Sequence, residues 1–108
     1  MIRKVTDEQL AEFLEFAQQA SNADYFKFMP DSMDMAPILE FSNITGNTKY
    51  VRIFTDRGTQ KMSWGFIKLD TGEVLKCDGW KKPALNFARG NIFEPDHGLS
   101  GVYWTGIR

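Results

Sequence analysis

The spacing of hydrophobic residues changes once along the chain. Between residues 5 and 20 the apolar side chains recur every three or four positions, which predicts an amphipathic helix. The stripe consists of Leu10, Phe13, Leu14 and Ala17. Thr6 followed by Gln9 three positions later is typical of a capping box, so we expect the helix to begin there. We expect it to fade near Asn22.

Residues 23–37 show no clear period. Pro30 and Pro37 interrupt the segment, which also holds three methionines. Methionine is a flexible apolar side chain that fills irregular gaps. We expect an irregular loop that packs on a sheet, and the alternative that the methionines line a contact surface stays open.

From residue 38 the apolar positions alternate with polar ones, which is typical of strands with one buried face. Four such segments form two hairpins: 38–44 with 49–55, and 61–69 with 73–80. Gly72 suits the left-handed position in the second hairpin loop, and residues 101–107 can add one more strand. The predicted fold is therefore α+β: a single domain, residues 1–108, in which an N-terminal amphipathic helix packs on an antiparallel β-meander of four to five strands.

The alternation also predicts which strand residues share a face. The two sets are Val51 with Ile53, and Met62 with Trp64 and Phe66. Gly65 interrupts the second set, and a glycine inside a strand indicates a bulge or a close backbone approach.

Composition narrows the functional classes. The chain has 108 residues, 43% of them hydrophobic and 25% charged, with a net charge of −1. A general nucleic-acid-binding protein usually has a more basic composition than a net charge of −1 indicates, so nucleic acid is not an expected partner. The single cysteine excludes an internal disulfide and fits a reducing compartment. Neither a signal peptide nor an apolar run of about 20 residues is present, so we expect a cytoplasmic protein without a membrane partner.

Catalytic motifs are scarce. One histidine and one cysteine do not supply the repeated ligand pairs of a zinc site, and the sequence lacks GxSxG, P-loop and GxGxxG motifs. The stretch "EPDHG" at 94–98 puts two carboxylates near His97, which suits acid–base chemistry or weak metal binding, but these residue types favour a surface turn. Cys77 lies in a strand pattern, where a half-buried apolar role is expected. We therefore expect a protein that is not an enzyme and needs no cofactor or metal.

The stretch 80–98 combines cations with aromatic rings. The cations are Lys81, Lys82 and Arg89, and the rings are Trp80, Phe87 and Phe93. Arginine pairs bidentately with phosphate, and a ring stacked on a base contributes about 1–3 kcal/mol. Asn91 is placed to read a base edge or a ribose hydroxyl, and residues 84–90 can form one helical turn closed by Gly90. In the alternative interpretation, Phe87, Ile92 and Phe93 fill the core while the cations are solvated.

The block "GFIKLDTGEVLKCDGWKKPALNFARGNIF" resembles a group of small proteins from tailed bacteriophages. The shared features are a strand, a T-G-[DE] turn, a second strand, a tryptophan–lysine motif, and proline–alanine and arginine–glycine pairs. The ending "VYWTGIR" is similar to their aromatic-rich last strand with its terminal arginine. The resemblance covers residues 61–108 and implies a phage origin more than a mechanism.

A second resemblance concerns the spacing of Asn91 from Arg108, which is similar to that in the type-one Thoeris anti-defence proteins. Those phage proteins sequester cyclic ADP-ribose signals made by bacterial immune enzymes and do not cleave them. The resemblance implies that Asn91 and Arg108 contact the ligand and that Trp80 stacks on adenine. It also implies a homo-oligomer, because that family binds its ligand between protomers, with Arg57 contacting phosphate from a neighbouring subunit.

The sequence thus predicts a phage anti-defence protein of the host cell cytoplasm that sequesters a nucleotide-derived immune signal. Its candidate ligand-binding residues are Arg57, Trp80, Lys81, Lys82, Arg89, Asn91 and Arg108. An alternative is a virion-associated or host-protein-binding module whose methionine-rich segment and helix face a partner. A third reading is a single-strand nucleic-acid binder with Tyr50, Arg52, Phe54 and Trp64 on an exposed sheet face, which the acidic net charge disfavours.

Overall fold

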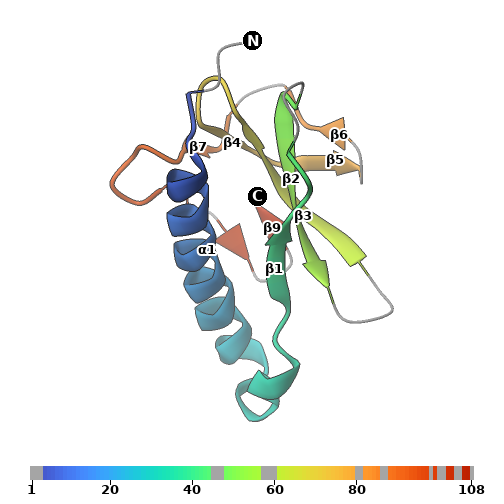
Figure 1. Ribbon diagram of the computed structural model, residues 1–108. Coiled ribbons are helices and arrows are strands. Elements are labelled where there is room, and N and C mark those ends of the chain that lie inside the picture. Colours follow the sequence, from blue (N-terminus) through green and yellow to red (C-terminus); the bar gives the residue numbers. More distant parts are fainter. Residues whose placement is uncertain are drawn as a thin grey trace.

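One helix packs against an antiparallel sheet of five strands in the computed structural model (Figure 1). The structure describes residues 4–44, 48–56, 61–79, 82–85, 88–97, 99, 102–103 and 106–107, with the backbone alone at 35, 102 and 103. The helix is α1 (Asp7–Phe28), and the strands, in spatial order, are β1 (Ile38–Phe41), β2 (Tyr50–Asp56), β3 (Lys61–Lys68), β4 (Glu73–Leu75) and β7 (Gly90–Asn91). The predicted α+β class, with an N-terminal helix on an antiparallel sheet, is confirmed.

Helix α1 begins at the predicted capping box. The Gln9 backbone N–H donates to the Thr6 hydroxyl (3.1 Å), and the Thr6 N–H donates to Gln9 Oε1 (2.9 Å). The predicted end near Asn22 is wrong, since the helix continues to Phe28. Ser21 and Tyr25 continue the stripe at four-residue spacing and are both buried, so tertiary packing stabilises the helix beyond its predicted end.

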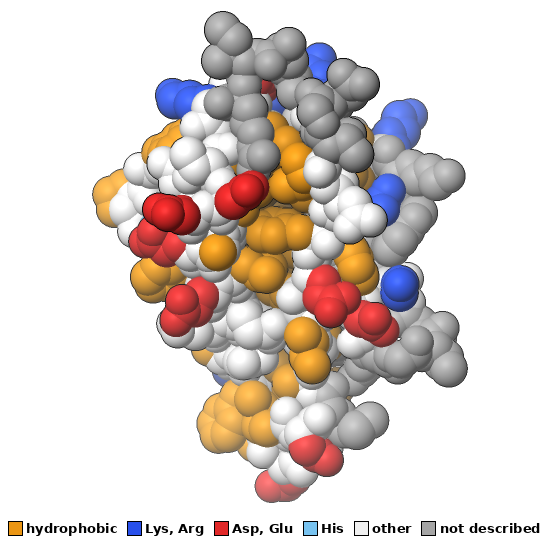
Figure 2. All heavy atoms as spheres, in the orientation of Figure 1, with side chains coloured by type: hydrophobic (Ala, Val, Ile, Leu, Met, Phe, Trp, Pro, Cys, Tyr) orange, Lys and Arg blue, Asp and Glu red, His pale blue; other side chains and the backbone are white. Residues whose placement is uncertain are grey.

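The chain leaves α1 through a short 3₁₀ helix, η1 (Pro30–Met35), where the sequence predicted an irregular loop. Proline at its first position suits a helix start, because the missing N–H has no partner there. The end of α1 and η1 project beyond the strands, and Figure 2 shows hydrophobic side chains at that end of the molecule. Gln18 joins α1 to the start of β1: its Nε2 donates to the Pro37 carbonyl (2.9 Å) and its Oε1 accepts from the Leu39 N–H (2.8 Å).

The first two predicted strands pair as an antiparallel β1–β2 hairpin, with Leu39 opposite Thr55. The next pair, β2–β3, changes register once: Ile53 lies opposite Gly65, whereas Phe54 lies opposite Ser63. Trp64 is therefore an extra residue in β3, and the bulge predicted beside Gly65 is confirmed.

The bulge corrects one predicted face of the sheet. Val51 and Ile53 are both buried, as expected, but Met62 is 58% exposed whereas Trp64 is 1% exposed. The extra residue breaks the alternation, so the three residues do not share one face: Met62 lies opposite Thr55, whereas Phe66 lies opposite Arg52 and is not in the core cluster that holds Trp64. Because Trp64 is buried in the core, it is not part of an exposed face for single-stranded nucleic acid.

The β3–β4 loop follows the prediction, and the chain beyond it does not. Gly72 has a φ of +81°, the left-handed conformation expected at that position. The strand predicted over 73–80 divides at Lys76 into β4 and β5 (Cys77–Gly79), and β5 pairs with β6 (Lys82–Pro83) in a separate two-stranded sheet. Pro83 is the last residue of the short strand β6.

The helical turn predicted over 84–90 is wrong for its described residues. Residues 84, 85, 88 and 89 are not helical, and Gly90 begins β7. Two backbone hydrogen bonds explain the difference: the Ala84 N–H donates to the Lys76 carbonyl, and the Arg89 N–H donates to the Val74 carbonyl, both at 2.8 Å. The segment is thus held against the sheet edge at both ends.

The last segment forms a hairpin of two short strands, β8 (Val102–Tyr103) and β9 (Gly106–Ile107), and not a further strand of the meander. The core consists of Val5, Leu10, Phe13, Ala17, Leu39, Val51, Ile53, Trp64, Ile67, Leu69, Val74, Ile92 and Ile107. It draws on α1, the main sheet and β9, so the C-terminal hairpin is part of the packed fold. None of the helices in the described residues combines the length and the apolar character needed to cross a membrane.

Candidate functional site

The structure describes three of the seven predicted ligand-binding residues: Lys82, Arg89 and Asn91. The other four, Arg57, Trp80, Lys81 and Arg108, lie outside the described residues. Residues 86 and 87, in the middle of the helical turn predicted over 84–90, also lie outside the described residues.

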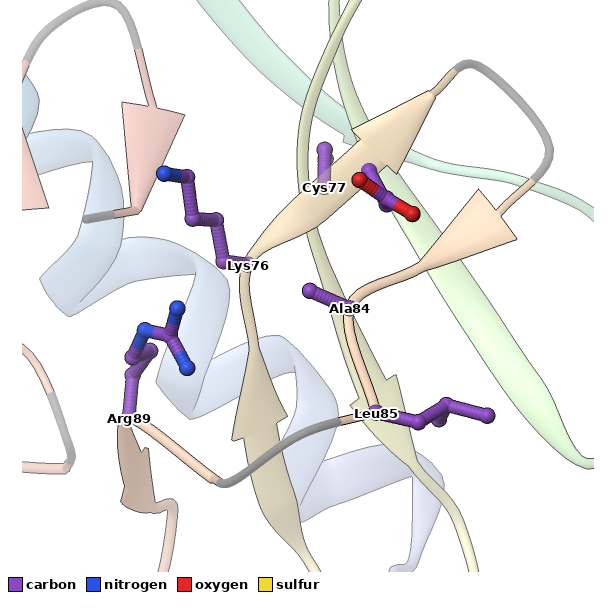
Figure 3. A pocket seen from close by; sticks show the side chains of 6 residues that line it. Lys76, Cys77, Ala84, Leu85 and Arg89 are labelled. Atoms are coloured by element: carbon purple, nitrogen blue, oxygen red, sulfur yellow. The ribbon is translucent and has the colours of Figure 1, made fainter.

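A pocket of about 360 Å³ lies at the junction of β4 and β5 (Figure 3). Its lining residues are Lys76, Cys77, Asp78, Ala84, Leu85 and Arg89. We call it the β4–β5 pocket. It contains one predicted site residue, Arg89, and a cation that the sequence analysis missed, Lys76.

Main-chain pairing places the two cations together. The Lys76 carbonyl accepts from the Ala84 N–H, and the Arg89 N–H donates to the Val74 carbonyl, so the backbone at both cations is fixed by the sheet edge. In Figure 3 the Lys76 and Arg89 side chains extend on the same side of the β4–β5 junction, whereas Leu85 points the other way. A guanidinium and an ammonium group at one mouth form a site that attracts an anion such as a phosphate.

A carboxylate adds a negative charge to the lining of the pocket. Asp78 lines the pocket, and its Oδ2 lies 4.0 Å from the Nζ of Lys82. The two side chains are 60% and 77% exposed, so this ion pair contributes little to stability. The Asp78 carboxylate can accept hydrogen bonds from hydroxyl or N–H donors of a ligand, and the pair brings the predicted residue Lys82 to the edge of the pocket.

Cys77 forms part of the pocket wall. Its Sγ lies 2.9 Å from the Ser63 hydroxyl oxygen. Burial raises the pKa of the Cys77 thiol, and the Ser63 hydrogen bond and the positive charge of Arg52 lower it by less. A protonated, half-buried thiol is a poor nucleophile at neutral pH, in agreement with the apolar role expected from the sequence.

Asn91 is outside this pocket, and its side chain is engaged within the chain. Its Nδ2 donates to the Thr71 carbonyl (3.0 Å), and its Oδ1 accepts from the Phe93 N–H (2.9 Å). Asn91 thereby joins the β3–β4 loop to the turn after β7. Its predicted ligand contact stays a prediction, and a ligand at Asn91 would have to share or replace these bonds.

The two apolar residues after Asn91 behave differently. Ile92 is buried in the core, as the alternative interpretation of this stretch expected, but Phe93 is 43% exposed. The Lys4 ammonium lies 5.1 Å from the Phe93 ring centre, within the range of a cation–π contact. Phe93 therefore covers the surface beside the β3–β4 loop and does not fill the core.

The 94–98 stretch forms the expected turn in its described part. The His97 N–H donates to the Glu94 carbonyl (2.9 Å), and the His97 ring stacks on Phe16 with centroids 4.4 Å apart. A hollow of about 210 Å³ beside it is lined by Gln9, Glu12, Ile92, Phe93, Glu94 and His97. Within the part of the chain that the structure describes, no group of three histidine, cysteine or carboxylate side chains is placed to hold a metal ion.

The sequence was compared with known proteins. Neither the curated proteins nor the solved structures contain a match to it. Residues 2–107 match a family of unknown function, DUF7717. Since this match spans nearly the whole sequence, the chain belongs to that family.

Proposed function

We propose that this chain binds a small nucleotide-derived immune signal of the cyclic ADP-ribose type and sequesters it without cleavage. It would act as a phage anti-defence protein in the cytoplasm of the host cell. The observation that carries the proposal is that Lys76 and Arg89 both line the β4–β5 pocket and extend on the same side of the β4–β5 junction. The resemblance of residues 61–108 to tailed-phage proteins, and the Asn91–Arg108 spacing, support the class of ligand.

The pocket suits such a ligand in size and in charge. Small-molecule sites typically have volumes of about 300–1,000 Å³, and this one has about 360 Å³. Lys76 and Arg89 would hold the phosphates, while the Asp78 carboxylate would accept hydrogen bonds from ribose hydroxyls or from the N–H groups of the base. Trp80 follows the last residue of β5 in the sequence and is the candidate for stacking on the base.

Sequestration is favoured over cleavage by the chemistry of the lining residues. The one thiol among the six belongs to Cys77, and its pKa is raised by burial. Its hydrogen-bond partner is a serine hydroxyl and not a histidine or another general base. These described residues therefore offer binding groups without an activated thiol.

An oligomer is part of the proposal. The resembled anti-defence proteins bind their ligand between protomers, and Arg57 would then reach the phosphates from a neighbouring subunit. Arg108 and Lys81 would complete the cationic environment. A dimer or larger assembly would place these charges around the open side of the pocket.

Isothermal titration with cyclic ADP-ribose isomers tests the proposal. We expect micromolar or tighter binding by the wild-type chain, with the ligand recovered chemically intact by mass spectrometry. Lys76→Glu and Arg89→Glu should each weaken binding by about tenfold or more, because a charge-assisted hydrogen bond contributes about 1.5–3 kcal/mol.

Lys61→Glu is the matched control, since Lys61 is an exposed cation that lies over Phe54 and does not line the pocket. It makes the same change of charge and should leave the affinity nearly unchanged. An absence of heat with every isomer, or equal losses in Lys61→Glu and Arg89→Glu, would overturn the proposal.

A further inference from the structure

The apolar stripe of α1 extends past the sheet. Its buried members recur through Ala17, Ser21 and Tyr25, and Phe28 is the next position on the same side of the helix. Phe28, however, is 66% exposed. Figure 1 shows the reason: the end of α1 lies beyond the strands, so the side of the helix that packs on the sheet elsewhere has no sheet to cover it here.

Two methionines continue this surface. Met29 caps the helix and is 39% exposed, and Met33, on η1, is 37% exposed. The Ser32 N–H donates to the Met29 carbonyl (3.2 Å), which holds η1 against the helix end. We call Phe28, Met29 and Met33 the end patch. Exposed apolar groups clustered on an ordered scaffold mark an interaction site more often than scattered ones do.

The segment that contains the end patch is acidic. Residues 24–40 contain four carboxylates and one lysine: Asp24, Asp31, Asp34, Glu40 and Lys27. This segment thus carries a net charge of −3, although the whole chain carries −1. In Figure 2 acidic side chains flank the hydrophobic ones at the lower end of the molecule, and most of the visible cations lie in the upper half.

The charge decides between the possible occupants. We call the four carboxylates, Asp24, Asp31, Asp34 and Glu40, the acidic rim. A second copy of the chain would bring an identical acidic rim against this one, and like charges at an interface oppose association. Anionic lipid and nucleic acid carry the same sign as the rim. A polypeptide with apolar side chains on one face and lysine or arginine beside them complements both the patch and its rim.

We propose that the end patch docks a cationic amphipathic segment of a partner protein. The apolar side chains of the partner contact Phe28, Met29 and Met33, and its cations face Asp31 and Asp34. Methionine side chains adapt their rotamers to the bound surface, so the patch accommodates helices of differing shape. The end patch shares no residue with the β4–β5 pocket, so this inference stands apart from nucleotide binding.

Fluorescence anisotropy with a labelled leucine–lysine amphipathic peptide tests the inference, with the leucine–glutamate peptide as its counterpart. We expect the wild-type chain to bind the cationic peptide and not the acidic one. Phe28→Ser with Met33→Ser should weaken binding by about tenfold, the loss expected when interface anchors are truncated. Met62→Ser is the apolar control, because Met62 is 58% exposed, between Met33 and Phe28, but lies on β3.

The acidic rim needs its own control. Asp31→Asn with Asp34→Asn should weaken binding, and Glu12→Gln with Glu15→Gln, which removes two charges from the exposed side of α1, should not. Equal losses in the two pairs would show attraction by net charge alone and overturn the inference.

Peptide binding unaffected by Phe28→Ser, or a dimer in sedimentation that Phe28→Ser dissociates, would also overturn it. Circular dichroism of each variant checks that the fold is retained.

Discussion

At the scale of single residues, Cys77 shows how neighbours set the chemistry of a side chain. Burial raises the pKa of its thiol, while the hydrogen bond with Ser63 and the charge of Arg52 oppose the rise. A folded-state pKa above the unfolded value stabilises the fold at all pH values below the unfolded pKa. This contribution is lost as the pH rises through the folded pKa.

The rate at which Cys77 reacts with DTNB tests this assignment. In the native protein we expect the pH–rate profile to have its midpoint above 9.0, the ordinary value for the thiol, and to move back to about 9.0 in urea. Ser63→Ala should raise the native midpoint further, because the hydrogen bond that lowers the pKa is removed. A native midpoint below 9.0 would mean that the thiolate is stabilised, and Cys77 would then be a candidate nucleophile.

At the scale of elements, the bulge in β3 and the C-terminal hairpin depend on each other. The absence of a side chain at Gly65 lets β9 approach: a Cβ there would lie 3.1 Å from the Ile107 Cγ1 and closer still to its Cδ1. Ile107 in turn belongs to the core. The close approach explains why a glycine, which weakens a strand in isolation, occupies the middle of β3.

A double-mutant cycle measures this dependence. Gly65→Ala should destabilise the fold by about 1–3 kcal/mol through overpacking, and Ile107→Ala by about 2–5 kcal/mol through loss of a core side chain. The double variant should lose less than the sum of the two, because the shortened residue 107 leaves room for the new methyl group. Urea unfolding provides the free energies, and strictly additive losses would show that the two residues do not contact each other.

Local signals explain which elements the sequence predicts well. The Thr6–Gln9 capping box, the β1–β2 hairpin and the loop at Gly72 each depend on residues close together in the sequence, and each is present. The length of α1, the division at Lys76 and strand β7 depend on partners far away, such as the bond from Arg89 to the Val74 carbonyl. Periodicity alone contains no information about those partners.

The residues of the candidate site also differ in whether the local sequence could predict them. Arg89 was predicted because cations and rings cluster in its segment, and it lines the β4–β5 pocket. Lys76 appears in the sequence only as one polar position in a strand, and nothing local links it to Arg89. Asn91 was predicted from its place in the same segment and from a resemblance, and in the structure its amide joins the β3–β4 loop to the turn after β7.

At the scale of the whole molecule, the two proposed surfaces have opposite charge and different occupants. The β4–β5 pocket presents Lys76 and Arg89 to an anion, whereas the end patch presents Phe28 and its neighbours inside an acidic rim. Such a separation allows a small ligand and a protein partner to bind without competing. It also makes the two proposals independently testable on one labelled protein.

The most direct test of the central claim is an NMR titration of the ¹⁵N-labelled chain with a cyclic ADP-ribose isomer. We predict that the amide signals of residues 76–78, 84, 85 and 89 shift with increasing ligand, while those of residues 28, 29 and 31–33 stay unchanged. In Arg89→Glu the shifts should require much higher ligand concentrations. No shift at any concentration, or shifts confined to residues away from the β4–β5 pocket, would contradict the account.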